Sequence, residues 1–371
     1  MNVGLCLSDP HPNYIGDGSN NRTLSASRFC GRYRLVDFVL SNMVNSGVYT
    51  IGMVLNSHFQ SLIGHIGMGK EWDLARKIGG VTFFPAYMND EHQSVDDEID
   101  SPLRRASEFL VESKAEFVVL ADSSVVYNMN YGDAIEAHNK SCADITAIYS
   151  RKHITKSEKQ CAVFFDIAED GRVQGIISAA DSDLELNVSL GAYIIPRECF
   201  LRLTAEDKSC GINRFSRVHI AGALKDLRVM AFEFKGYSAQ ICSVDTFFHY
   251  NMEMLDVDKG SALFDFGGRR IFTSRRDSPP TKYGKSADIK RSIISDGCRI
   301  DGTVENSVLC RYVEVGPGAT VNNCILQEGT VIGRDVQLNC IITDRGVVIT
   351  KNPDMSNYST HPAYIKRSKH I

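Results

Sequence analysis

The fold of this chain is decided by residues 3–38, which read VGLCLSDPHPNYIGDGSNNRTLSASRFCGRYRLVDF. An apolar run at residues 3–7 predicts a buried first strand, and residues 33–38 lead into apolar residues at helical spacing. A loop of about twenty residues separates them, which is long for a compact domain and therefore indicates a functional origin. In α/β proteins, nucleotide phosphates commonly bind in the loop after the first strand.

This loop lacks the residues that bind phosphate. Asp9, Pro10 and Pro12 stand at its start, where a phosphate-binding loop needs glycines and free backbone N–H groups. Asp9 would repel a triphosphate, and a proline has no N–H to donate. We therefore expect a loop in the position of a nucleotide site that does not bind a nucleotide.

The chain outside this loop predicts two domains. Helical spacing at residues 35–46, a strand at 49–55 and a helix at 57–66 give a strand–helix–strand–helix order, which favours a parallel, doubly wound sheet. Further strands are expected at 117–120, 145–149, 189–196 and 229–234. We place the first domain at residues 1–258 and a polar, proline-bearing connector at 259–285.

Residues 286–371 show a different periodicity. Apolar pairs recur at 293–294, 308–309, 325–326 and 341–342, about every sixteen residues, which is typical of short parallel strands stacked coil on coil. We predict a left-handed parallel β-helix of about four coils, with an ordinary antiparallel sheet as the alternative. The edge coils of such a solenoid favour oligomers, so the chain alone is expected to form a homo-oligomer.

Composition excludes several classes of protein. A net charge of −4 over 371 residues argues against nucleic-acid binding, and no apolar run has transmembrane length. The eleven cysteines include no C-x-x-C pair, so free buried thiols and a cytoplasmic location are expected. No metal-ligand spacing is present, and we predict no metal site.

Several motifs then identify a resemblance. Residues 34–42 (RLVDFVLSN) resemble the F-R-I-I-D-F-x-L-S-N segment of bacterial glucose-1-phosphate adenylyltransferases, also called ADP-glucose pyrophosphorylases. Residues 189–193 (SLGAY), 251–252 (NM) and 279–282 (PPTK) continue the resemblance over nearly the whole chain. It implies a nucleotidyltransferase-like, Rossmann-like mixed α/β sheet domain followed by a left-handed parallel β-helix.

The chain departs from this family at its functional motifs. Aligned from the first strand, the family's loop glycines fall on Asp9, Pro10 and Pro12, its loop arginine on Tyr14 and its lysine on Leu24. The family's sugar-phosphate lysine falls on Ala179, one metal aspartate falls on Gln240, and the other falls on Ser124 unless an insertion places Asp122 there. Nucleotidyl transfer depends on cations and donors placed where charge develops, so these losses predict impaired catalysis.

The resemblance therefore points to the GlgD-type regulatory subunit of that family. It implies a hetero-oligomer, a heterotetramer, with a catalytic glucose-1-phosphate adenylyltransferase subunit that makes ADP-glucose and diphosphate for glycogen biosynthesis. No cofactor is expected in this chain, and Mg²⁺ is expected in the catalytic partner. The alternatives are a weakly active or altered-specificity nucleotidyltransferase that uses Asp122, and a stand-alone module that binds a sugar-phosphate effector.

Three arginines are candidate effector ligands. Arg22, Arg28 and Arg34 lie in the N-terminal segment, where basic residues of this family help to bind sugar-phosphate effectors, and guanidinium groups suit phosphate. The alternative is that Arg34 packs against Asp37 or the sheet edge and that the other two are solvated.

Overall fold

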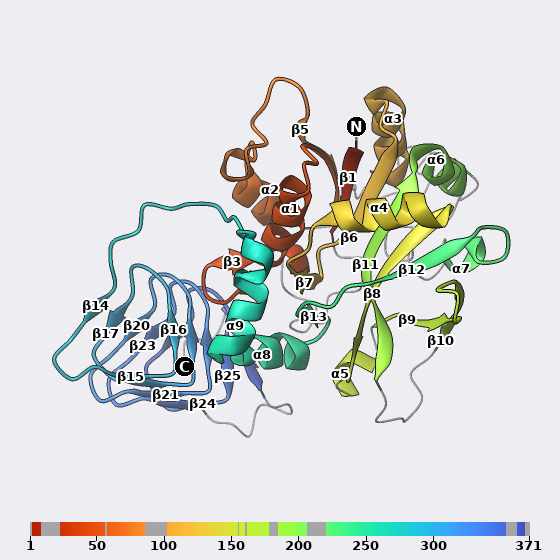
Figure 1. Ribbon diagram of the computed structural model, residues 1–371. Coiled ribbons are helices and arrows are strands. Elements are labelled where there is room, and N and C mark those ends of the chain that lie inside the picture. The colour runs from red at the N-terminus through yellow and green to blue at the C-terminus, as the bar shows by residue number, and fades with distance from the viewer. Residues whose placement is uncertain are drawn as a thin grey trace, which may run out of the picture.

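The computed structural model describes residues 2–8, 23–55, 58–85, 102–154, 156–159, 162–177, 185–205, 220–353 and 362–367. Figure 1 shows an α/β domain beside a β-helix, with helices α8 (Val244–Glu253) and α9 (Val257–Phe264) where the two meet. The predicted order, a mixed α/β domain followed by a β-helix, is confirmed.

The α/β domain is built on a mixed sheet of nine strands. Its parallel part contains β1 (Asn2–Leu7), β4 (Thr50–Leu55), β5 (Gly80–Pro85) and β6 (Phe117–Asp122). Strand β11 (Leu186–Pro196) runs antiparallel to β6 and connects it to β8 (Ile145–Lys152), β9 (Phe164–Ile167), β10 (Val173–Ile177) and β12 (Val229–Glu233). The predicted parallel order therefore holds for the first half of the domain, and β11 makes the whole sheet mixed.

Helices cover both faces of this sheet, because side chains along each strand alternate between the faces. In β1, Val3 and Leu5 pack with α3 and α6, whereas Cys6 faces α1. One face carries α1 (Leu35–Asn45), α2 (Gln60–Ile66) and α4 (Tyr131–Ser141), and the other carries α3 (Pro102–Ser113), α6 (Arg197–Ala205) and α7 (Ile220–Ala223). In the described part of the chain, no helix is long and apolar enough to cross a membrane.

Short elements connect these layers. They are the 3-10 helices η1 (Leu24–Ala26), η2 (Lys70–Trp72) and η6 (Phe266–Gly268), the helix α5 (Lys156–Lys159), and the strands β2 (Arg28–Phe29), β3 (Tyr33–Arg34), β7 (Val125–Tyr127) and β13 (Ser238–Gln240). Strands β2 and β3 pair antiparallel, which places Arg28 opposite Arg34. Strand β13 pairs with β7, so Gln240 lies opposite Val125.

The β-helix has three parallel sheets, one for each side of its coil. The first contains β14 (Lys282–Tyr283), β17 (Arg299–Ile300), β20 (Glu314–Val315), β23 (Val331–Ile332) and β26 (Val348–Ile349). The second contains β15 (Asp288–Lys290), β18 (Thr303–Glu305), β21 (Thr320–Asn322) and β24 (Gln337–Asn339). The third contains β16 (Ile293–Ile294), β19 (Val308–Leu309), β22 (Ile325–Leu326), β25 (Ile341–Thr343) and β27 (Ala363–Ile365).

The third sheet explains why the apolar residues come in pairs. In a pair such as Ile325–Leu326, the second member points inward and joins the solenoid core, while the first points outward. In the pair Ile341–Ile342 the order is reversed. In register, the outward residues form one apolar stripe: Ile293, Val308, Ile325, Ile342 and Tyr364. This outward stripe packs against Leu24, Phe29 and Phe38 of the α/β domain in a cluster that we call the interdomain core.

The connector placed at residues 259–285 begins within a helix. Helix α9 runs to Phe264 and therefore includes the first residues of this segment. Beyond η6, residues 269–281 contain no helix or strand before β14 begins at Lys282. This shorter extended segment carries the chain from the α/β domain to the first coil of the β-helix (Figure 1).

The cysteines mostly follow the prediction of free thiols. Those that are free among the described residues are Cys6, Cys30, Cys142, Cys199, Cys298, Cys310, Cys324 and Cys340. The prediction is wrong for Cys242, which is disulfide-bonded.

The outward stripe predicts a specific effect of Ile325→Ala. Ile325 is 1% exposed in the interdomain core, so we expect the substitution to lower the free energy of unfolding by about 2–4 kcal/mol and to speed proteolysis within residues 269–281. The matched variant Leu326→Ala instead leaves a cavity inside the solenoid core. It should destabilise the chain to a similar extent without speeding that cleavage, and equal cleavage of the two variants would contradict this account of the stripe.

Candidate functional site

The carboxyl ends of β1 and β6 meet at the position of the predicted nucleotide site, because Leu7 and Asp122 are paired in register. A chain of hydroxyl groups closes this edge. The Ser8 and Ser25 hydroxyls lie 2.9 Å apart, Ser25 lies 2.6 Å from Ser123, and Ser123 donates to the Leu7 carbonyl at 2.9 Å. All three serines are buried. Neutral, mutually satisfied hydroxyls therefore occupy a strand edge where phosphate chemistry would need cations.

Asp122 is the one carboxylate at this edge that the sequence singled out. It is 4% exposed, and its Oδ1 accepts the Ser124 backbone N–H at 2.7 Å. Burial raises the pKa of Asp122 from its ordinary value of 3.8 to about 7, against the opposing effect of the hydrogen bond from Ser124. Its carboxyl is therefore readily protonated near neutral pH.

The other two candidate metal positions are neutral. Gln240 is 4% exposed and Ser124 is 1% exposed, and strand pairing holds them close, because the Ile241 N–H donates to the Ser124 carbonyl. Among the described residues, the Gln240 Oε1 and the Ser124 Oγ have no hydrogen-bond partner. Mg²⁺ prefers carboxylates and retains several waters, so this buried set does not suit it. The described residues also contain no group of three or more His, Cys, Asp or Glu that could hold a metal ion.

Leu24, the predicted lysine position, has a structural role. It is 4% exposed in η1 and belongs to the interdomain core. A lysine there would place an ammonium among apolar side chains, which is unfavourable without a partner. The remaining predicted positions, Asp9, Pro10, Pro12, Tyr14, Arg22 and Ala179, lie outside the described residues.

A second site forms where the α/β domain meets the β-helix. Arg28 in β2, Arg276 in the connector and Arg345 after β25 all bind one carboxylate, that of Glu328. The N–O distances are 2.5 Å from Arg28 and 2.9 Å from Arg345 to Oε2, and 2.8 Å from Arg276 to Oε1. Burial acts to raise the pKa of Glu328, but Arg28, Arg345 and Arg276 together lower it below its usual range. Glu328 is therefore ionised.

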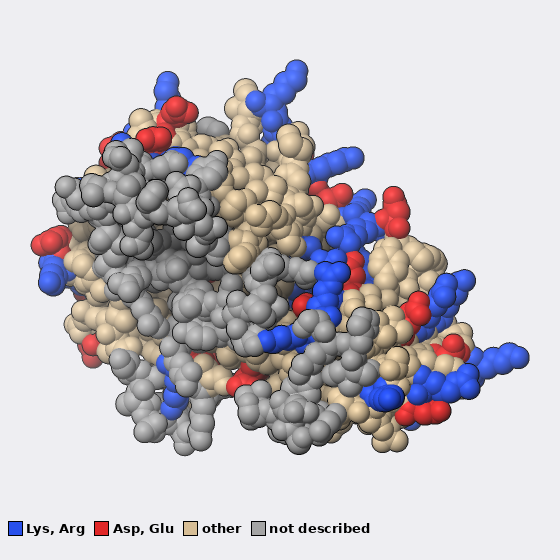
Figure 2. Space-filling view, turned by 180° about the vertical axis from the view of Figure 1, so that it is seen from behind, with Lys and Arg blue, Asp and Glu red and all other residues tan. Residues whose placement is uncertain are grey.

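A fourth arginine, Arg311, lies beside this group. Its side chain is 4% exposed, its carboxylate neighbour Asp296 lies 4.0 Å away, and its Nε has no hydrogen-bond partner in the described part of the chain. Burial, and then the positive charges of Arg28 and Arg276, lower the pKa of Arg311. We call Arg28, Arg276, Arg311 and Arg345, together with Glu328, the arginine cluster. Seen from behind, lysine and arginine side chains gather over the half of the molecule that holds the β-helix (Figure 2).

Arg34 has a different role from Arg28, although they are paired across β2 and β3. Its Nη1 donates to the Ser61 carbonyl at 2.7 Å, and its backbone N–H donates to the Asp37 carboxylate at 2.8 Å. Asp37 also binds the His65 Nε2 at 2.6 Å. Burial, and then Arg28, lower the pKa of Arg34 to about 9. The structural alternative for Arg34 is thus supported, while its charge still adds to the positive potential of the cluster.

The sequence reasoning missed Arg276, Arg311, Glu328 and Arg345. A signal was present, because the last three are seventeen residues apart and each follows an apolar pair of the third sheet. The register of β19, β22 and β25 stacks them on successive coils. Only the docking of the two domains brings this column to Arg28, 300 residues away from Glu328 along the chain.

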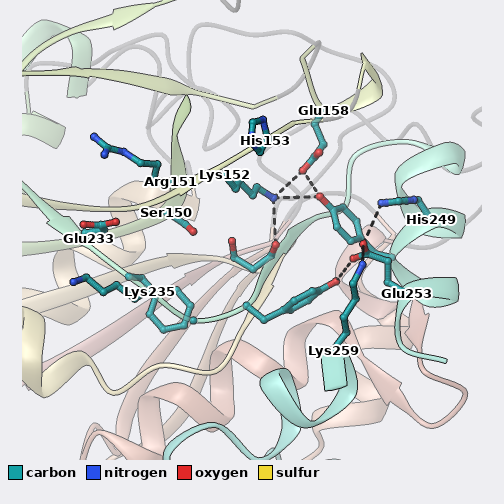
Figure 3. Close-up of a pocket in the computed structure, with 15 residues that line it drawn as sticks. Ser150, Arg151, Lys152, His153, Glu158, Glu233, Lys235, His249, Glu253 and Lys259 are labelled. Atoms are coloured by element: carbon teal, nitrogen blue, oxygen red, sulfur yellow. Dashed lines mark hydrogen bonds and ion pairs between the residues drawn. The ribbon is translucent and has the colours of Figure 1, made fainter. Parts of the chain in front are cut away.

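A separate cavity of about 410 Å³ lies between β8, β12, α5 and α8 (Figure 3). The Lys152 ammonium donates to the Glu158 carboxylate at 2.9 Å and to the Ser238 carbonyl at 3.2 Å. Glu253 accepts from the Tyr237 hydroxyl at 2.8 Å and pairs with Lys259 at 2.5 Å. Glu158 and Glu253, which line the cavity, are thus each paired with a lysine. Their contacts connect α5 and α8 to the sheet.

Comparison with known proteins agrees with the two-domain architecture. A nucleotidyl transferase family model matches residues 21–255, and a model of the GlmU-like C-terminal hexapeptide matches residues 279–356. The first match covers more than half of the chain and corresponds to the α/β domain. The second corresponds to the β-helix.

Whole proteins that are similar to this chain identify a smaller group within the nucleotidyl transferases. The chain is 32% identical over 309 residues to the glycogen biosynthesis protein GlgD of Geobacillus stearothermophilus, covering 81% of this chain and 77% of that protein. It is 29% identical over 320 residues to GlgD of Bacillus subtilis, covering 85% and 81%. It is 28% identical over 333 residues to glucose-1-phosphate adenylyltransferase of Clostridium perfringens strain 13, covering 89% and 84%.

The buried state of Asp122 leads to a pH-dependent prediction. The folded chain keeps this proton up to about pH 7 and the unfolded chain releases it near 3.8, so the ionisation costs stability progressively between those values. We expect Asp122→Asn to match the parent chain near pH 4 and to exceed its stability at pH 8 by up to about 4 kcal/mol. Thermal melts across this range measure the difference.

Asp133→Asn is the matched control, because Asp133 is exposed in the first turn of α4. Its stability gain over the parent chain at pH 8 should be much smaller than that of Asp122→Asn, because an exposed carboxylate loses little hydration on folding. A flat profile for Asp122→Asn would instead mean that the carboxylate is ionised when folded and so is available to a cation.

Proposed function

Because this chain belongs to the nucleotidyl transferase family, in the group of glucose-1-phosphate adenylyltransferases and GlgD proteins, we propose that it is a catalytically impaired regulatory subunit that acts in glycogen biosynthesis. It assembles with a catalytic glucose-1-phosphate adenylyltransferase subunit, which binds Mg²⁺, and modulates the synthesis of ADP-glucose. It carries no cofactor of its own, and its site of action is the cytoplasm.

The observation that carries this proposal is the neutral, buried edge at β1, β6 and β13. Adenylyl transfer needs positive charge and hydrogen-bond donors where negative charge develops in the transition state. Here Ser124 and Gln240 offer neutral oxygens, burial favours the protonated form of Asp122, and Leu24 is part of an apolar core. An intact scaffold with this chemistry suits a subunit that works through a partner.

The arginine cluster supports the regulatory half of the proposal. Guanidinium groups bind phosphate oxygens in pairs. Three arginines here bind one carboxylate, and the fourth, Arg311, lies close enough for Arg28 and Arg276 to lower its pKa. Arg28 and Arg311 are buried, while Arg276 and Arg345 are 41% and 33% exposed, so the group is open to solvent on one side. We assign it as the site of a sugar-phosphate effector.

The second candidate function is a weakly active nucleotidyltransferase. Asp122 favours it, because it lies at the carboxyl end of β6 and retains a carboxyl group at the predicted site. The two functions differ in what the isolated chain does.

The partner assay tests the leading proposal. The purified chain is mixed with a catalytic glucose-1-phosphate adenylyltransferase from the same source, and diphosphate release and size-exclusion elution are followed. We expect no turnover by this chain alone, co-elution with the catalytic chain, and a changed rate or effector response of the mixture. Independent elution with unchanged rates would overturn the proposal, and turnover by this chain alone that Asp122→Asn abolishes would establish the second candidate.

The effector assay uses two neighbouring arginines that face different ways. Arg276 binds Glu328 in the cluster, whereas Arg275 is 79% exposed and lies 3.3 Å from Glu71. We expect fructose 1,6-bisphosphate to raise the melting temperature of the parent chain and of Arg275→Gln. Arg276→Gln should bind it at least about fivefold more weakly, because one phosphate ligand is lost. Equal binding by both variants would place the effector elsewhere.

A further inference from the structure

Glu328 occupies the position in the arginine cluster where an external anion would bind. Its two carboxylate oxygens accept hydrogen bonds from Arg28 and Arg276, and Arg345 lies 2.9 Å from Oε2. Its side chain is 9% exposed. Such multiple contacts from guanidinium groups to one oxyanion are the arrangement that arginines use to bind phosphate.

The charge of the cluster exceeds what Glu328 neutralises. Three guanidinium groups bind this one carboxylate, and a fourth, that of Arg311, lies beside them. Arg34, which Asp37 partly neutralises, lies close enough for Arg28, Arg345 and Arg276 to lower its pKa. Asp296, the other carboxylate in this column, is 58% exposed and 4.0 Å from Arg311. The unpartnered Nε of the buried Arg311 is a further unused donor at this place. The cluster can therefore hold more negative charge than it contains.

We propose that Glu328 is a built-in competitor for the effector's phosphate, which must displace this carboxylate from the arginines in order to bind. The proposal rests on the effector site assigned above and concerns its regulation. A phosphate group carries up to two charges and three free oxygens, so it can replace the carboxylate and leave fewer donors unused. The carboxylate thereby lowers the affinity of the site and makes it selective for strongly charged anions.

The displacement also releases a contact between the domains. Arg28 belongs to β2 and Glu328 to the turn between β22 and β23, so their ion pair connects the α/β domain to the solenoid. The Glu328 backbone stays in place, because its carbonyl accepts the Gly346 N–H from the next coil. Only the side chain has to rotate. Occupation of the site is then coupled to the arginine contacts that connect β2, the connector and the β-helix.

The test compares Glu328→Gln with Asp296→Asn in the full chain. Each variant removes one carboxylate from the same column of coils, but only Glu328 contacts three arginines. Without phosphate, Glu328→Gln should melt below the parent chain, because the arginines then repel each other unopposed. Inorganic phosphate should restore it with a larger shift than in the parent chain. Calorimetric titration with fructose 1,6-bisphosphate should show binding at least about tenfold tighter. Asp296→Asn should change the affinity far less, because it removes an exposed carboxylate that lies 4.0 Å from Arg311 and contacts no other arginine of the cluster in the described residues.

The outcomes separate this proposal from the assignment of the site. If the parent chain binds fructose 1,6-bisphosphate and Glu328→Gln binds it no more tightly, Glu328 is a structural ligand and the competition is refuted while the site stands. If neither binds it, both the site and the competition are refuted. Should Glu328→Gln fail to fold without phosphate, Glu328→Asp replaces it, because it keeps the charge on a shorter side chain. Its affinity should lie above that of the parent chain, and an unchanged affinity would again refute the competition.

Discussion

The structure depends on the docking of an apolar stripe of the β-helix onto the α/β domain. Val308, Ile325 and Ile342 point out of the solenoid and are fully buried against residues such as Phe29 and Phe38. A solenoid on its own would expose these side chains, and their burial is the main favourable contribution to holding the two domains together. The docking is therefore a consequence of the same sheet that builds the core of the β-helix.

Everything at the arginine cluster follows from this contact. Arg28 comes from a two-residue strand near the N-terminus, and Glu328 and Arg345 come from turns of the solenoid. Once the apolar stripe is buried, these side chains lie close together at a partly desolvated domain boundary. Ion pairs are strong there, and unpaired charges are costly. Glu328 relieves part of the repulsion, and the remaining positive charge makes the place suitable for phosphate. A chain with a net charge of −4 thus carries a local centre of the opposite sign.

The carboxyl ends of β1 and β6, in contrast, carry mostly neutral buried groups. The strands that would carry the catalytic groups keep their register, as the pairing of Leu7 with Asp122 and of Val125 with Gln240 shows. Hydroxyl groups satisfy one another there, and burial favours a neutral Asp122. The fold tolerates neutral groups at this edge because its stability comes from the apolar layers on both faces of the sheet and not from the charges at its edge.

The sequence by itself determined the order of the domains and the solenoid, and its resemblance to the family predicted impaired catalysis. These features depend on local pattern. Apolar runs specify buried strands, and a repeat of about sixteen residues specifies coils. A proline lacks its N–H, and a glutamine lacks a charge, in any surroundings. It also indicated Arg28 as a candidate, through resemblance alone.

Only the tertiary structure decided which charges act together. The sequence could not show why both residues of each apolar pair are apolar, because one fills the solenoid interior and the other is buried only when a second domain covers that side of the coil. The sequence could not distinguish the roles of the two arginines: Arg28 forms an ion pair with Glu328, whereas Arg34 donates a hydrogen bond to the Ser61 carbonyl. Contacts between residues 300 positions apart depend on how two surfaces fit. That fit is set by the packing of whole domains, which no local pattern encodes.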